Sequence, residues 1–196
     1  PQKQSGPVIV VAQALTDTGH KVPDAIKDAI TLIAPVLRAL RHSDGGLARF
    51  HGGGAGIEGR LDRALAATGI RGAPAKDLHM GFGRLTGGRT TFIADAAAPP
   101  ERGHASTLGF ELTSGRRPVI VNCGAGARFG PDWRRASRAT PSHSTMMIEG
   151  VSSSQLAQMR GGTESLTDTP TAVHGNLSDQ GTSRRLEMSH NGYQAS

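Results

Sequence analysis

The sequence predicts an α+β protein in which a helical piece precedes an antiparallel β-sandwich. Apolar residues recur every three or four positions over residues 23–42, as on one face of a helix. From residue 80 onward, short strand-like runs are separated by turns, and the chain has 27 glycines but only 4% aromatic residues. Helices that are followed by hairpins, rather than alternating with strands, indicate segregated layers and an antiparallel sheet.

Three helices are expected from the apolar spacing and from signals at the helix ends. They span residues 8–19, 23–42 and 57–68. The second begins with Pro23 and Asp24 and has arginines near its carboxyl end, as the helix dipole favours. Gly45 and Gly46 end this helix, and the glycine-rich segment 51–56 then leads to the third.

Strands are expected where runs of β-branched, aromatic and aliphatic residues flank short turns. Gly87-Gly88 and Ser114-Gly115 each indicate a hairpin between two such runs. The expected strands are 81–86, 89–95, 107–112, 118–123 and 144–149, with weaker ones at 172–174 and 185–189. Residues 131–136 are expected to form a helical turn that covers the sheet.

The two ends of the chain suggest that it is part of a longer protein. The first residue is Pro1 rather than methionine, and the strand-like run over residues 185–193 enters a turn with no later strand to pair with. We therefore expect both ends to have been cut out of a longer sequence, with the β-sandwich truncated at its carboxyl end.

The net charge of +6, which comes mostly from arginine, is typical of proteins that bind anionic partners. An ordinary solvated surface explains these arginines most simply, and acidic polysaccharide is the favoured anionic partner because guanidinium binds carboxylate and sulfate groups. The arginines form pairs without a continuous basic stripe or interleaved aromatic residues, so no nucleic-acid partner is expected. No apolar run approaches the ~20 residues of a membrane-spanning helix, and no membrane partner is expected.

Motifs of common catalytic chemistry are absent from the sequence. It contains no Cys pair, no His-Glu-x-x-His and no Gly-x-Ser-x-Gly, and the segment 51–56 lacks the Gly-Lys-Ser/Thr that closes a phosphate-binding loop. Asp95, Glu111 and Glu149 lie on separate expected strands, where they are able to pair as acid and base, although strand carboxylates usually face solvent.

Several chemically notable residues are expected to be structural. Cys123 follows an apolar run and is expected to be a small buried hydrophobe. Trp133 is expected to fill a packing gap, with stacking on a sugar ring as the alternative. His42 and His51, like the other histidines of helix ends and loops, are expected on the surface.

His104, Asn122 and His143 form the main candidate site. They lie at the ends of three successive strand-like segments, with consecutive members 18 and 21 residues apart. Strands of this spacing can pair side by side, so three polar side chains that are distant in the sequence are expected to meet at one place.

Several ordered motifs resemble the heparinase II/III family of polysaccharide lyases. These motifs are residues 44–50, 83–95, 104–112, 119–124 and 143–145. The resemblance implies the terminal helices of an α/α toroid over residues 1–46, followed by an antiparallel β-sandwich over residues 47–196. It also implies a polysaccharide lyase that cleaves uronate-containing acidic glycans by β-elimination, in the periplasm or cell envelope.

The resemblance does not assign catalytic residues to this chain. The family uses Tyr and His residues, largely from the toroid, as base and acid, and this chain has no tyrosine before Tyr193. We therefore expect the chain alone to be inactive. The alternative function is a non-catalytic carbohydrate-binding or structural β-sandwich.

The resemblance further implies a zinc ion, which the family's sandwich holds with His, Asp and His from three strands. The matching residues are His104, Asn122 and His143, so the neutral amide of Asn122 replaces a carboxylate, and Ser106 replaces a nearby acid. The lost negative charge favours a metal-free, hydrogen-bonded cluster of the same three residues over an occupied zinc site. Either arrangement is expected to be structural rather than catalytic.

Overall fold

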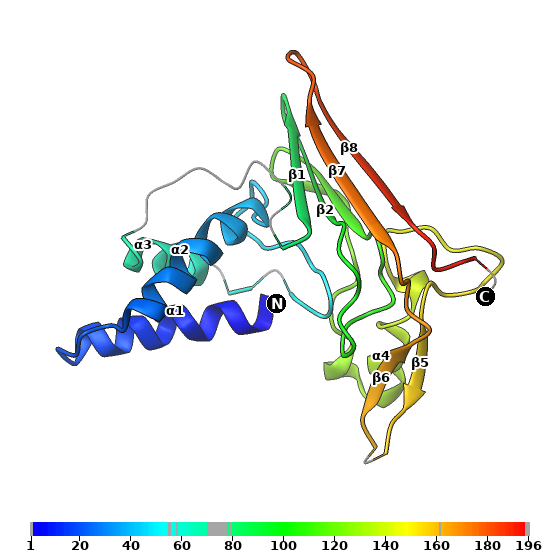
Figure 1. Cartoon of the computed structure of the whole chain (residues 1–196), viewed down its shortest axis with the longest axis horizontal. Coiled ribbons are helices and arrows are strands. Elements are labelled where there is room, and N and C mark those ends of the chain that lie inside the picture. The colour runs from blue at the N-terminus through cyan, green and yellow to red at the C-terminus, as the bar shows by residue number, and fades with distance from the viewer. Residues whose placement is uncertain are drawn as a thin grey trace.

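The computed structural model describes residues 2–54, 56–57, 59–69, 78, 80–160 and 162–194. Helices come first in the chain and strands follow, which confirms the predicted α+β class (Figure 1). The helices are α1 (Gln2–Asp17), α2 (Asp24–Ala39), α3 (Arg60–Ala67) and α4 (Pro131–Ala136), with short 3-10 helices η1 (Ala127–Phe129) and η2 (Thr140–Ser142). The strands are β1 (Phe82–Gly87), β2 (Thr90–Asp95), β3 (Phe110–Ser114), β4 (Arg117–Ile120), β5 (Gln155–Gln158), β6 (Glu164–Thr167), β7 (Val173–Asp179) and β8 (Arg184–His190).

The predicted helical segments correspond to α1, α2, α3 and α4. The apolar stripe of α2 shares one cluster with residues of α1 and α3 through Ile30, Ala34 and Leu37, because these residues lie on one face of the helix. α3 belongs to this helical cluster through Leu65, although it follows residue 47, where the β-sandwich is predicted to begin. That domain boundary stays a prediction. None of the described helices is long and apolar enough to span a membrane.

A second apolar cluster joins the end of α2 to the sheet. Leu40 packs with Phe50 from the segment after the helix and with Phe82 and Ile93 from β1 and β2. The rings of Phe50 and Phe82 are stacked with centroids 5.6 Å apart. One face of the sheet is therefore covered by the end of α2 and by residues 47–50.

The described strands form three antiparallel units. The main sheet has the order β1-β2-β3-β4, and β5-β6 and β7-β8 are separate hairpins. The predicted hairpin between β1 and β2 is present, but Gly87 lies opposite Thr90, so its two-residue turn is Gly88-Arg89, one residue later than the predicted Gly87-Gly88. The β7-β8 hairpin runs beside β1 and β2 (Figure 1), and a Cβ added to Gly83 would lie 3.1 Å from a methyl group of Leu186. The β7-β8 hairpin thus covers part of the sheet at β1, whereas β4 is mostly exposed.

The strand predicted over residues 144–149 is wrong. This segment has only an isolated bridge between Ile148 and Val151, and its apolar side chains are exposed. The predicted strand over residues 107–112 begins only at Phe110, because Leu108 has a φ of 59° and Gly109 donates its N–H to the Ser106 carbonyl.

The pairing predicted for the last strand is also wrong. β8 pairs along its whole length with β7, from Val173 opposite His190 to Asp179 opposite Arg184. A partner strand therefore precedes β8, and no later strand is needed to complete the pair.

Candidate functional site

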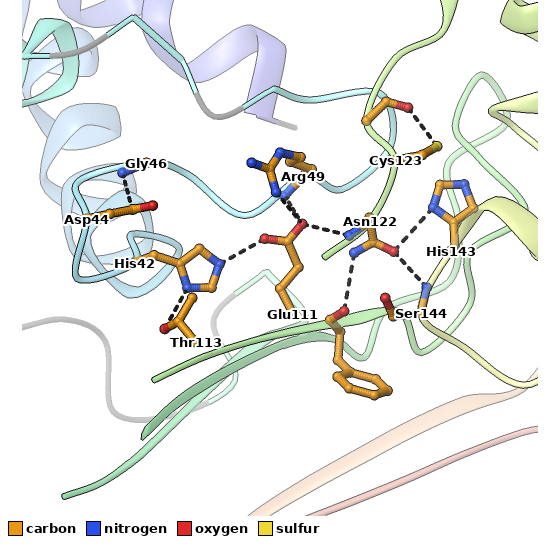
Figure 2. Close-up of polar contacts among 12 residues, drawn as sticks. His42, Asp44, Gly46, Arg49, Glu111, Thr113, Asn122, Cys123, His143 and Ser144 are labelled. Carbon is orange, nitrogen blue, oxygen red and sulfur yellow. Dashed lines mark hydrogen bonds and ion pairs between the residues drawn. The ribbon is translucent and has the colours of Figure 1, made fainter. Parts of the chain in front are cut away.

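The three predicted site residues converge, and all three are buried. His104 Nδ1 lies 3.2 Å from His143 Nε2, and His143 Nδ1 lies 3.3 Å from Asn122 Oδ1. The same Asn122 oxygen accepts a hydrogen bond of 3.0 Å from the N–H of Ser144 (Figure 2). The prediction that these side chains meet at one place is confirmed.

Loops, rather than three paired strands, bring these residues together. His104 lies in the long connection between β2 and β3, Asn122 follows β4, and His143 follows η2. The loop of His104 is fixed because the N–H of Ala105 donates to the Arg138 carbonyl and Thr140 Oγ1 donates to the Ala105 carbonyl. The strand-end placement expected for His104 and His143 is therefore wrong, although their convergence is right.

The cluster has one consistent pattern of protons. Asn122 Oδ1 only accepts, so His143 Nδ1 carries a proton and donates to it. Burial lowers the pKa of His143 from its usual range to about 4, so the ring is neutral at pH 7 and Nε2 has no proton. His143 Nε2 then accepts a hydrogen bond from the N–H at His104 Nδ1. At neutral pH the hydrogen bonds run in one direction, from His104 through His143 to Asn122.

Glu111 on β3 is fully buried beside this cluster. Its Oε1 accepts hydrogen bonds from the N–H groups of Asn122, at 3.0 Å, and Arg49, at 3.1 Å, and its Oε2 accepts one from His42 Nε2 at 2.9 Å (Figure 2). The Arg49 guanidinium also lies 3.7 Å from Oε1. Asn122 joins Glu111 through its backbone and His143 through its side chain, so the two groups form one polar network.

The Glu111 contacts correct two sequence expectations. His42 is buried instead of lying on the surface. Its Nε2 is hydrogen-bonded to the Glu111 carboxylate, and its Nδ1 lies 3.5 Å from the hydroxyl of Thr113. Glu111 faces away from solvent because its neighbour across the sheet, Ile93, belongs to the apolar cluster under α2. The face that carries Glu111 is covered at this position, so the usual exposure of strand carboxylates does not apply.

His51 and Asp95 form a second buried pair. His51 Nε2 lies 2.6 Å from Asp95 Oδ2, and His51 Nδ1 accepts a hydrogen bond from the N–H of His104. His51 has a φ of 48°, which few non-glycine residues adopt. The expected surface position of His51 is wrong. Asp95 and Glu111 each face their own histidine, and Glu149 is exposed, so the three acids do not pair with one another.

Gly52 is expected to be essential for the packing of His104. Its φ is 77°, and a Cβ placed there would lie 2.9 Å from His104 Nε2. Gly52→Ala is therefore expected to lower the free energy of unfolding by about 1–2 kcal/mol through the left-handed backbone alone. Gly54→Ala is the matched control, because Gly54 has no positive φ and no neighbour closer than 4.0 Å. Urea unfolding of both variants checks the difference, and equal stabilities would contradict it.

Cys123 and Trp133 differ from their predicted roles. Cys123 is exposed, and its thiol donates a long contact of 3.7 Å to the Ser137 carbonyl. Partial burial of the sulfur nevertheless raises the pKa of the Cys123 thiol, so it stays protonated at neutral pH. The Trp133 side chain is also exposed and fills no packing gap.

Comparison with known proteins identifies the family. The family model described as "Heparinase II/III-like, C-terminal" matches residues 71–196. The chain belongs to the heparinase II/III-like family. It is also 31% identical over 124 residues, or 60% of its length, to "FtsZ-localized protein C" of Caulobacter vibrioides (strain NA1000 / CB15N). The matched segment covers 21% of that relative, and no solved structure matches the chain.

A zinc ion does not fit the candidate site of this heparinase II/III-like chain as it is arranged. Structural zinc sites place about four donors around one centre. His104 Nδ1 and His143 Nε2 face one another, but Asn122 Oδ1 lies on the opposite nitrogen of His143 and cannot share their centre. No group of three or more His, Cys, Asp or Glu in the described part of the chain is placed to hold a metal. The donor geometry favours the hydrogen-bonded cluster over an occupied zinc site.

Proposed function

We propose that this chain is the supporting part of a polysaccharide lyase that cleaves uronate-containing acidic glycans by β-elimination. The match to the heparinase II/III-like family over residues 71–196 carries the proposal. The net charge of +6 supports an acidic glycan as the ligand, because arginine binds carboxylate and sulfate groups. The periplasm or cell envelope is the proposed location.

The described histidines near the site support a structural role for this chain. β-Elimination requires a base that reaches the proton next to the uronate carboxylate. His42 and His143 are buried, and both ring nitrogens of each contact other protein groups. His51 is likewise held at both nitrogens by Asp95 and by the backbone of His104. These residues fix the loops of the site, and the base and acid are supplied from elsewhere in the whole protein.

The full-length protein and the 196-residue chain test this proposal together. Full-length protein mixed with polygalacturonate, alginate, hyaluronan and heparin is expected to raise the ultraviolet absorbance with at least one of them, because elimination leaves an unsaturated uronate. The 196-residue chain is expected to give no rise. A full-length protein that binds these glycans but leaves the absorbance unchanged would contradict the lyase.

A non-catalytic carbohydrate-binding or structural module is the second candidate. Asn122 favours it, because a neutral amide stands at the position where the family resemblance implies a carboxylate. The name of the Caulobacter vibrioides relative, FtsZ-localized protein C, gives a location at FtsZ rather than a reaction. Glycan retention by the full-length protein without cleavage, together with co-localisation with FtsZ, would favour this candidate over the lyase.

A further inference from the structure

Two large aromatic side chains are exposed on one loop, residues 126–137. Phe129 in η1 is 68% exposed and Trp133 in α4 is 63% exposed. Their ring centroids are 6.5 Å apart, with one ring edge toward the other face. Exposed aromatic groups that touch each other present a joint apolar surface, which is unusual without a ligand or partner.

The two ends of this loop are joined by hydrogen bonds. The N–H of Gly126 donates to Ser137 Oγ at 3.0 Å, and Ser137 Oγ donates to the Arg134 carbonyl at 3.1 Å. A Cβ at Gly126 would lie 2.2 Å from the Trp133 carbonyl oxygen, so only glycine permits this approach. The two aromatic residues are therefore held on a rigid loop, which limits the entropy lost when a ligand binds.

The loop also carries unpaired positive charge. Arg128 and Arg134 are exposed, and neither makes an ion pair with another described residue. Arg135 differs, because it pairs with Glu164 on β6. Asp132 is the single acidic residue of the loop and leaves its net charge positive. Such a surface complements a ligand that combines apolar ring faces with anionic groups.

The loop directly follows the candidate site in space as well as in sequence. The Cys123 thiol contacts the Ser137 carbonyl at the base of the loop, and Asn122 of the polar network immediately precedes Cys123. The base of the loop is therefore tied to the segment that carries Asn122.

We infer that Phe129 and Trp133 form a stacking platform for the sugar rings of an acidic glycan, with Arg128 and Arg134 binding its carboxylate or sulfate groups. The C–H face of a pyranose packs on an indole or phenyl ring, while anionic substituents project from the ring edge toward guanidinium groups. The inference rests on the acidic-glycan ligand of the proposed function, and it adds the subsite.

Trp133 is the only tryptophan in the chain, so its fluorescence reports directly on this platform. Titration of the 196-residue chain with oligogalacturonate or a heparin oligosaccharide is expected to change the emission and saturate. A neutral cello-oligosaccharide of the same length is expected to cause a much smaller change. Added salt is expected to weaken binding of the acidic ligand, because the arginine contacts are screened.

Variants compared by affinity electrophoresis in gels that contain polygalacturonate test the named side chains. Trp133→Ala is expected to weaken binding about tenfold, and Trp133→Phe to restore part of it. The double variant R128Q/R134Q is expected to weaken binding similarly and to reduce its salt dependence. Val119→Ala on β4 and Arg116→Gln in the turn between β3 and β4 are matched controls, because both residues are exposed outside the loop.

Two results would overturn the platform while leaving the proposed function intact. One is acidic-glycan binding that W133A and R128Q/R134Q leave unchanged, and the other is glycan cleavage by a full-length W133A protein with an unchanged KM. Equal binding of neutral and acidic oligosaccharides would also overturn the inference. Loss of FtsZ binding in these variants, without any glycan binding by the parent chain, would assign the surface to a protein instead. If the full-length protein neither binds nor cleaves acidic glycans, the proposed function fails as well.

Discussion

Replacing Glu111 by alanine is expected to lower the free energy of unfolding by about 3–5 kcal/mol. Glu111 has no solvent-exposed surface, and its carboxylate accepts hydrogen bonds from His42, from the backbone of Arg49 and from the backbone of Asn122. The substitution leaves these buried donors without an acceptor, and each then carries the cost of its lost hydration. A loss of this size is a large part of the stability of an ordinary domain.

Guanidinium chloride unfolding, followed by circular dichroism, measures this effect. Glu111→Gln is expected to cost less than Glu111→Ala, because the amide keeps the shape and one acceptor oxygen. Glu101→Gln is the matched control, since the Glu101 side chain is exposed, and its effect is expected within about 0.5 kcal/mol. A Glu111→Ala variant as stable as Glu101→Gln would show that the buried network does not stabilise the fold.

The periodic elements of this fold follow from local sequence. The apolar spacing of α2 and the Gly87-Gly88 turn both act over a few residues, so they predict the helix and the β1-β2 hairpin without knowledge of distant contacts. β5 and β6 lack such a signal. Gln155–Gln158 and Glu164–Thr167 are rich in polar residues, and their strand geometry depends on pairing with each other.

The candidate site is only partly predictable for a similar reason. Convergence of His104, Asn122 and His143 follows from polar residues placed beside apolar runs. The role of Glu111 does not, because its partner His42 is 69 residues away and lies beyond the end of a helix. The alternation of β3 separates Phe110 from Glu111, but it cannot reveal that the side with the charged Glu111 is the buried one, while Phe110 is only partly buried.

Protonation of His143 is expected to destabilise the fold as the pH falls. The pKa of His143 in the folded chain is lowered by burial to about 4, whereas an unfolded histidine has a pKa of about 6.5. Between these values the unfolded chain binds more protons, so the free energy of unfolding decreases with falling pH. The contribution is complete above about pH 6.5 and lost by about pH 4, and it amounts to roughly 3 kcal/mol.

Proton NMR of the His143 ring checks the pKa directly, and denaturant unfolding at several pH values between about 4 and 7 checks its effect on stability. In His143→Gln the titrating group is gone, so this part of the pH dependence is expected to disappear even if the variant is less stable throughout. His20→Gln is the control, because His20 lies exposed after α1 and its ring contacts the hydroxyl of Thr18. A His143 ring that titrates near 6.5 would mean that it is hydrated or held by a negative charge, which the neutral amide of Asn122 does not provide. Burial of His143 beside a neutral amide therefore sets the pH range in which this cluster is stable.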